Sequence, residues 1–571
     1  MSIKSKGLLF STISLVVVRV VCTPSSAATC QGLAGLTLPN AAVTAAQSIT
    51  SGSFTPPGST TPLTGLPPFC RVAVTSRPTN DSIINLEVWI PLGAGWNGKY
   101  EQLGCGGFCG SISYSGLGRA IGRGYASAAT DDGSQAGGLA TFALGHPEKI
   151  IDFGYRALKE TTDKAKAIIA AFEGNGPHPS YFNGCSDGGR EALQEAQRFP
   201  DDFDGIIVGS PANAWTHLFS GFIWNEQALL DDPASYIPPS LLPVLSKAAI
   251  AQCVKQDGGV PTDIFLNDPR DCPFDPASVQ CTPGQDPTTC LSAAQVKAAR
   301  KIYSGPHDPR TGELIFPGYE PGSESNAANW PLWIVGASRA ADLSGNISAG
   351  QALQEFFGNN FFADFVFQNP NFDFHTFNFT SDVAIADDGV GEIVNSINPD
   401  LRPFKNHGGK MIHYVGWADS AIAPMNSVNY YQQVQDVLRT AVQRDHDGDS
   451  LEEIQEFYRL FMVPGMAHCG GGDGPNAFGN GLDAPVIDAE HDLLQALDRW
   501  VENGIAPDKI IATHYINNSP ANGVQFQRPL CPFPQAARYN RVGDPSNANS
   551  FTCVDDEPDR DPRDQNLPPG Y

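Results

Sequence analysis

The sequence has few basic residues and almost no long apolar runs. It contains 36 Lys and Arg against 61 Asp and Glu, which gives a formal net charge of −25. Nucleic acids and anionic membrane surfaces repel such a polyanion, so neither is an expected partner. After the N-terminal segment, no stretch reaches about 18 uninterrupted apolar residues, so no transmembrane helix is expected in the mature chain. An internal repeat is also lacking.

The length and composition indicate a globular protein larger than one ordinary domain. The chain has 571 residues, of which 41% are hydrophobic and 17% charged. A single core rarely grows to this size, so we expect two units, or one domain with a large insertion.

The N-terminus has the pattern of a secretory signal. Lys4 and Lys6 precede an apolar stretch from Leu8 to Val21, and small residues at 25–28 provide a cleavage site. We therefore predict that residues 1–28 are a signal peptide and that the protein is secreted, to the periplasm or the extracellular space. Of the 13 cysteines, Cys22 would leave with this segment, so 13 − 1 = 12 remain, enough for six disulfides in an oxidising compartment.

The order of segments predicts an α/β fold with an insertion. Residues 29–212 alternate between strand-like and helix-like patterns, which favours a mostly parallel sheet, and the same pattern resumes over 399–555. Residues 213–398 are rich in Pro, Gly, Asn and Asp and show little periodicity, and we interpret them as an inserted lid domain, called the lid below. A charged, Pro-rich tail covers 556–571.

One short motif predicts a nucleophilic serine. Residues 184–188 read Gly-Cys-Ser-Asp-Gly, a G-x-S-x-G pattern, with a strand-like segment before it and a helix start after it. This is the context of the nucleophile turn of α/β-hydrolases, so we expect that fold with Ser186 as nucleophile. A glycine-rich turn without a catalytic role is the alternative for the motif alone.

A serine hydroxyl needs a base, and the base needs an acid that orients it. His468 follows the predicted strand Phe457 to Val463, and Asp419 follows the strand that begins at Met411. Both therefore lie at strand ends, in the chain order Ser, Asp, His of α/β-hydrolases. Taken separately, a surface histidine and a turn aspartate remain the alternatives.

Two cysteines connect the candidates. Cys185 directly precedes Ser186, and Cys469 directly follows His468. A disulfide between them requires Cα atoms within about 7 Å, which would bring nucleophile and base together.

This Cys-Ser…Asp…His-Cys pattern resembles the tannase and feruloyl esterase family. The likeness covers nearly the whole mature chain, and the segments that support it are WNGK at 96–99, GCGGF at 104–108, YFNGCSDGGRE at 181–191, QRFP at 197–200, GGKM at 408–411, VPGM at 463–466 and RPLCPFP at 528–534. The family is also similar to the bacterial hydrolase of mono(2-hydroxyethyl) terephthalate. An aromatic residue of that enzyme is Ile422 here, which argues against terephthalate half-esters.

The resemblance implies a serine carboxylesterase with its lid between the serine and the aspartate. It implies an oxyanion hole made by the backbone N–H groups of Gly107 and Asp187. It also implies four further disulfides, Cys30–Cys70, Cys253–Cys272, Cys281–Cys290 and Cys531–Cys553. The remaining pair, Cys105 and Cys109, is close enough in sequence to form a local bridge, and its pairing stays open.

The resemblance further implies a calcium loop in the lid, with Asp257 and Asp263 as ligands. The usual aspartate after the first cysteine is Val254 here, and fewer carboxylates mean weaker calcium binding. The chemistry itself needs no cofactor. The implied substrates are small or polysaccharide-linked aromatic esters, with feruloyl (hydroxycinnamoyl) esters first and galloyl esters second. A catalytically silent glycan- or cell-wall-binding protein is the alternative from another class.

Overall fold

The computed structural model describes residues 28–336, 350–442 and 450–556. The predicted signal peptide and the predicted tail lie outside these residues, except for one residue of each. Among the described residues, no helix is both long enough and apolar enough to cross a membrane.

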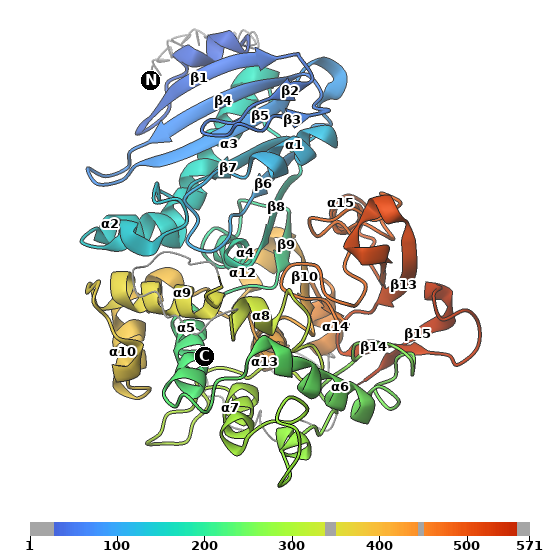
Figure 1. The fold of residues 1–571 in the computed structure, drawn as a ribbon. Coiled ribbons are helices and arrows are strands. Elements are labelled where there is room, and N and C mark those ends of the chain that lie inside the picture. The colour runs from blue at the N-terminus through green and yellow to red at the C-terminus, as the bar shows by residue number, and fades with distance from the viewer. Residues whose placement is uncertain (1–27, 337–349, 443–449, 557–571) are drawn as a thin grey trace, which may run out of the picture.

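A nine-stranded mixed sheet forms the centre of the molecule (Figure 1). The first strands pair antiparallel, and from β7 onward neighbouring strands are parallel. In spatial order the strands are β1 (Ala41–Ile49), β4 (Phe69–Ser76), β5 (Ile84–Pro91), β7 (Ala126–Thr130), β6 (Tyr100–Leu103), β8 (Ser180–Cys185), β9 (Gly205–Gly209), β10 (Lys410–Gly416) and β11 (Tyr458–Val463). The predicted strands at 84–90, 125–129, 411–414 and 457–463 are therefore present, shifted by at most two residues at their ends.

Helices cover both faces of the sheet, as the α/β-hydrolase fold requires. On one face α3 (Ala157–Glu173), α4 (Asp187–Arg198) and α13 (Pro424–Val442) share a core with the strands. On the other face lie α1 (Tyr114–Gly122) and α15 (Leu493–Asn503). Short helices α2 (Pro147–Ile151), α12 (Arg402–His407) and α14 (Ser450–Gln455) complete this part of the fold. The fold class predicted from the sequence is confirmed.

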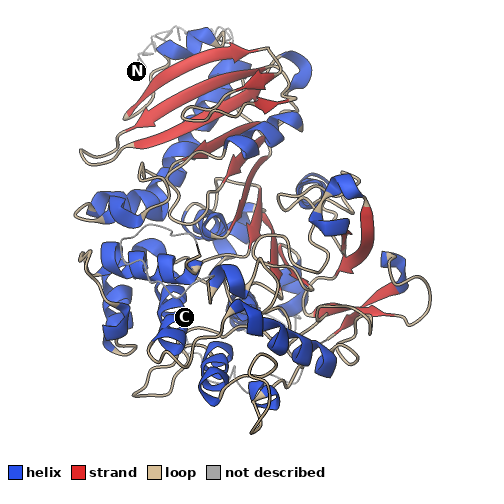
Figure 2. Ribbon diagram, in the orientation of Figure 1, coloured by secondary structure: helices blue, strands red, loops and turns tan. Residues whose placement is uncertain are grey.

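Between β9 and β10 the described residues form helices and loops but no strand (Figure 2). The α-helices of the lid are α5 (Trp215–Leu230), α6 (Leu242–Cys253), α7 (Ala293–Ser304), α8 (Trp330–Trp333), α9 (Leu353–Asn360), α10 (Ser381–Ala386) and α11 (Glu392–Val394), and α12 follows them before β10. Most of α5 is buried on all sides. A helix buried all round shows no 3.6-residue alternation, which explains why the sequence of α5 lacks periodicity.

The C-terminal part contains two antiparallel hairpins that the sequence analysis did not predict. They are β12 (Ile510–Tyr515) with β13 (Val524–Leu530), and β14 (Gln535–Tyr539) with β15 (Phe551–Asp555). A two-residue pair, β2 (Ser53–Phe54) with β3 (Leu63–Thr64), lies near the N-terminus.

Six disulfides are formed in the structure. Four are the pairs that the family resemblance implied, Cys30–Cys70, Cys253–Cys272, Cys281–Cys290 and Cys531–Cys553. The pair left open in the sequence forms a local bridge, Cys105–Cys109, and the sixth bond joins Cys185 to Cys469. Six disulfides fit a protein of an oxidising, extracytoplasmic compartment.

Candidate active site

Ser186 lies on a sharp turn between β8 and α4. Its backbone has φ 68° and ψ −121°, a conformation that non-glycine residues rarely adopt. The turn is possible because residue 184 is glycine: a Cβ added to Gly184 would lie only 2.2 Å from the carbonyl oxygen of Gly188. The N–H of Ser186 donates to the carbonyl of Gly209 in the next strand, at 3.0 Å. These contacts hold the strained residue at the carboxyl edge of the sheet, where its side chain lines a cavity.

The structure brings His468 to this serine. Its Nε2 lies 2.8 Å from Ser186 Oγ, and its Nδ1 lies 2.9 Å from Asp419 Oδ2. The imidazole comes from the loop after β11, where the side chain of Asn480 donates to the carbonyl of Cys469 at 2.9 Å. A base within hydrogen-bond distance of the serine and of an orienting carboxylate is the arrangement that nucleophilic catalysis requires.

Asp419 is buried, and its second oxygen is also satisfied. Oδ1 accepts hydrogen bonds from the backbone N–H groups of Ala421 and Ile422, both at 2.9 Å. Two backbone donors stabilise the ionised carboxylate and fix its plane. Asp419 can therefore hold His468 in the tautomer that carries its proton on Nδ1.

The predicted disulfide between Cys185 and Cys469 is present, with a Cα–Cα distance of 6.0 Å and a sequence separation of 284 residues. Because Cys185 precedes Ser186 and Cys469 follows His468, the bond ties the turn that carries Ser186 to the loop that carries His468.

Two backbone amides are placed for an oxyanion. Gly107 and Asp187 both line the cavity beside Ser186. Within the described residues, neither N–H donates to another backbone carbonyl outside the regular elements. Gly107 has φ 60°, which favours glycine, and a Cβ there would lie 3.1 Å from the ring of Phe357.

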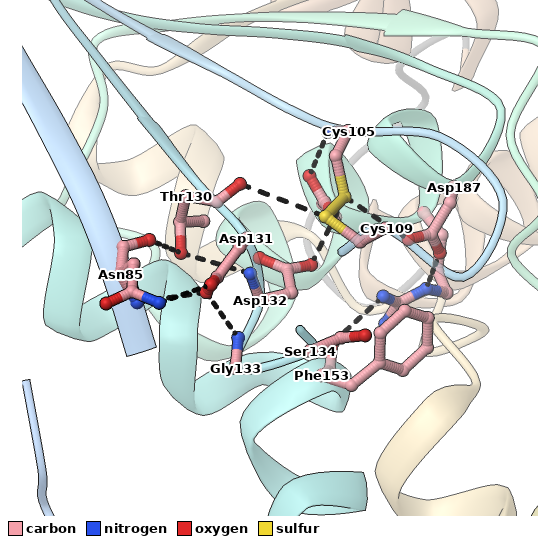
Figure 3. Close-up of a disulfide and its surroundings, with 12 residues drawn as sticks. Asn85, Cys105, Cys109, Thr130, Asp131, Asp132, Gly133, Ser134, Phe153 and Asp187 are labelled. Atoms are coloured by element: carbon pink, nitrogen blue, oxygen red, sulfur yellow. Dashed lines mark hydrogen bonds and ion pairs between the residues drawn. A yellow bond between two sulfur atoms is a disulfide. The ribbon is translucent and has the colours of Figure 1, made fainter. Parts of the chain in front are cut away.

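A disulfide and a buried acidic cluster support the loop that carries Gly107 (Figure 3). Cys105, bonded to Cys109, donates its N–H to Glu191 Oε2 at 3.1 Å, and its sulfur lies 3.5 Å from Asp132 Oδ2. Both carboxyl groups are buried. The cysteines are in a disulfide, so this cluster offers no thiolate to a metal ion.

The cluster holds more carboxyl groups than cations. Arg190 pairs with Asp187 and donates to the carbonyls of Gly154 at 2.8 Å and Phe153 at 3.1 Å. Burial, together with the like charge of Asp187, raises the pKa of Asp132 to about 7, and burial raises the pKa of Glu191 well above its usual range. The carboxyl oxygens of Asp132 and Glu191 lie within 4.8 Å of each other. Two carboxylates this close in a buried site repel each other, which favours a proton on the pair.

The cavity at Ser186 has a volume of about 560 Å³. One wall is formed by lid and neighbouring residues that are almost all apolar, namely Ala212, Trp215, Leu218, Phe219, Phe222, Trp333, Phe357, Ala421 and Ile422. The other wall is more polar and consists of Ser111, Ser113, Gly116, Arg119, Asn480 and Gly481.

Sequence reasoning did not identify the lid residues that face the catalytic groups. The ring of Trp333 packs edge-on against His468, with centroids 5.1 Å apart, and stacks on Phe357 at 6.2 Å. No pattern in the sequence separates these two rings from the many other aromatic residues of the lid. Glu191 could have been noticed, because it belongs to the family segment at 181–191.

The predicted calcium ligands do not line the catalytic cavity and fit calcium poorly. Asp257 accepts hydrogen bonds from the backbone N–H groups of Gly259 at 3.0 Å and Asn267 at 2.7 Å. Its carboxylate therefore holds together the loop from 257 to 267. Asp263 faces the guanidinium of Arg528 at 3.4 Å, a cation that already neutralises it. With both carboxylates engaged, calcium binding stays an untested prediction, and no step below uses it.

Comparison with known proteins gives a consistent assignment. Residues 70–554 match the family model described as "Tannase and feruloyl esterase". The chain belongs to this family. It is 43% identical to an uncharacterized esterase of Xanthomonas campestris pv. campestris, over 93% of this chain and 92% of that protein.

Solved structures agree with the family assignment. Feruloyl esterase B from Aspergillus oryzae superposes with a TM-score of 0.81 at 29% identity, over 92% of this chain and 99% of that one. Tannin acyl hydrolase from Aspergillus niger gives a TM-score of 0.68 at 25% identity, over 90% of both chains. The protein is therefore a carboxylic ester hydrolase of the tannase and feruloyl esterase family.

Proposed function

We propose that this esterase hydrolyses feruloyl and related hydroxycinnamoyl esters with Ser186 as nucleophile, His468 as general base and Asp419 as the orienting acid. The observation that carries the proposal is the position of His468, whose two ring nitrogens lie 2.8 Å from the serine hydroxyl and 2.9 Å from the carboxylate.

The first half-reaction forms an acyl-enzyme. His468 Nε2 removes the proton of Ser186 as Oγ attacks the ester carbonyl carbon. The carbonyl oxygen becomes an oxyanion and accepts from the N–H groups of Gly107 and Asp187, each worth about 3 kcal/mol in comparable sites. His468 then gives its proton to the departing alcohol, and the bond from carbon to the alcohol oxygen breaks.

The second half-reaction releases the acid. Water gives a proton to His468 and attacks the acyl carbon, and a second oxyanion forms in the same place. Its collapse breaks the bond to Ser186 Oγ, which takes back the proton. Asp419 stabilises the imidazolium in both halves through its contact with Nδ1. No cofactor is needed at any step.

The lid wall favours a feruloyl over a galloyl group. Its side chains are apolar except for the indole N–H groups of Trp215 and Trp333, which can only donate hydrogen bonds. A feruloyl ring carries one hydroxyl and one methoxy group, whereas a galloyl ring would bring three hydroxyls to a wall with few partners for them. Buried polar groups without partners cost free energy, so galloyl esters are the second candidate.

We also propose that the protein acts outside the cytoplasm, after removal of residues 1–28. The six disulfides and the signal pattern support this localisation.

Hydrolysis of methyl ferulate and methyl gallate tests the proposal. The wild type is expected to prefer methyl ferulate, and Ser186→Ala to lose activity by about 10³-fold or more. Ser304→Ala, an exposed serine at the end of α7, is the matched control and should retain activity. A preference for gallate would make the protein a tannase. Lack of activity of the wild type on both esters, and on a short-chain aryl ester, would favour the silent glycan-binding protein.

A further inference from the structure

The polar wall of the cavity consists of residues of α1, of the segment just before it and of the loop after β11, none of which belongs to the lid. None of its residues is aromatic, and Ser111 and Arg119 are exposed. Ser186 and His468 line the same cavity as both walls. An ester bound at Ser186 has two halves, and an aromatic acyl group matches the apolar wall. The alcohol half must then meet the polar wall.

Arg119 carries the only formal charge on the polar wall. No described carboxylate forms an ion pair with it, whereas Arg123, one turn further along the chain, pairs with Asp483 and Asp492. The guanidinium of Arg119 lies beside the loop after β11, since a Cβ on Gly481 would be 4.0 Å from Nη1. The charge of Arg119 acts on the buried Glu101, but it forms no ion pair with it. In a chain of net charge −25, an arginine at the cavity without an ion pair among the described residues is available to an external anion.

We propose that Arg119 binds a carboxylate on the alcohol half of the substrate. The favoured substrates are then hydroxycinnamoyl esters whose alcohol half carries a carboxylate, in place of esters of neutral alcohols. The proposal rests on the proposed function, because it takes the acyl group as aromatic and Ser186 as the nucleophile. The neighbouring hydroxyls of Ser111 and Ser113 are suited to the hydroxyl groups of such an alcohol.

A pair of substrates that differ only in charge tests this inference. One is feruloylquinate, with a free carboxylate, and the other is its methyl ester at that carboxylate. The ratio of their kcat/KM values, measured within one enzyme preparation, cancels differences in folding and active fraction. We expect the wild type to prefer the free acid by about fivefold at low salt, the value of a partly exposed ion pair. This preference should fall in about 0.5 M NaCl because salt screens it.

Three variants complete the test. Arg119→Gln should bring the ratio close to one, and Arg119→Lys should restore part of the preference. Arg77→Gln removes an equal charge from an exposed position outside the cavity lining and should keep the wild-type ratio.

A wild type that cleaves both feruloylquinate compounds equally, or an Arg119→Gln variant that keeps the preference, overturns the role of Arg119 while the proposed function stands. A wild type that cleaves neither compound nor methyl ferulate overturns both together.

Discussion

On the sheet side of the cavity, Ser186, His468 and Asp419 are joined by hydrogen bonds of 2.8 and 2.9 Å. On the lid side, aromatic rings pack at centroid distances of 5.1 and 6.2 Å, as Trp333 does against His468 and Phe357. The sheet side depends on directional contacts between few atoms, and the lid side on many weak, non-directional ones. A single substitution should therefore lower the activity by orders of magnitude on the sheet side and only by small factors on the lid side.

The largest effect is expected from Asp419→Asn. The amide would donate to His468 Nδ1 and stabilise the wrong tautomer, so kcat should fall by about 10⁴-fold with little change in KM. Asp231→Asn is the matched control, because Asp231 contacts His375 Nδ1 at 2.8 Å outside the cavity. Steady-state kinetics on methyl ferulate measures both. A loss of kcat below about tenfold for Asp419→Asn would contradict the contrast between the sheet side and the lid side.

An intermediate effect is expected from Asp132→Asn, beneath the oxyanion loop. The pKa of Asp132 is raised to about 7 in the folded protein, against 3.8 for a free carboxyl. The contribution of this raised pKa to the free energy of unfolding is therefore complete below about pH 4, and it is lost as the pH rises through about 7. The amide of the variant cannot ionise. The free energy of unfolding of the variant should therefore increase, relative to that of the wild type, by up to about 1.4 kcal/mol per pH unit between about pH 5 and 7.

Denaturant unfolding at pH 5, 6 and 7 measures this gain. A stability difference that does not change with pH would show that Asp132 has no raised pKa between pH 5 and 7 in the folded protein.

The smallest effect is expected from Phe357→Leu on the lid wall. Loss of one ring contact should raise KM for methyl ferulate by about two- to tenfold and leave kcat nearly unchanged. Phe362→Leu is the matched control, because Phe362 is buried in the lid core and does not line the cavity. The control should lower the thermal midpoint without raising KM. A large fall in kcat for Phe357→Leu would mean that the lid takes part in the chemistry.

The sheet side could be predicted well from the sequence because its determinants are local. The turn at Ser186 needs glycines on both sides, and the cysteines beside Ser186 and His468 report a contact across 284 residues. Asp419 followed from chain order and from its place after a strand. Each of these signals is contained in a few neighbouring residues of the sequence.

Other parts could not be predicted because their determinants are tertiary. Helix α1 contains three glycines, which are poor helix formers, and its sequence resembles a loop. The structure explains two of them, since a Cβ on Gly116 would lie 2.8 Å from Leu103 and one on Gly118 would lie 3.1 Å from Leu66. The position of Arg119 on the cavity depends on that helix and was missed with it. Trp333 and Phe357 were missed because nothing local distinguishes a ring on the cavity from a ring in the lid core.

The bond between Cys185 and Cys469 also sets an order of events in the making of the enzyme. The ribosome completes the serine turn long before it reaches the loop that carries His468, with the whole lid in between. The covalent link therefore cannot form on a partly synthesised chain that ends within the lid. Since such bonds form in oxidising compartments, Cys185 and Cys469 can be joined only after Cys469 has been synthesised and both cysteines are in an oxidising environment.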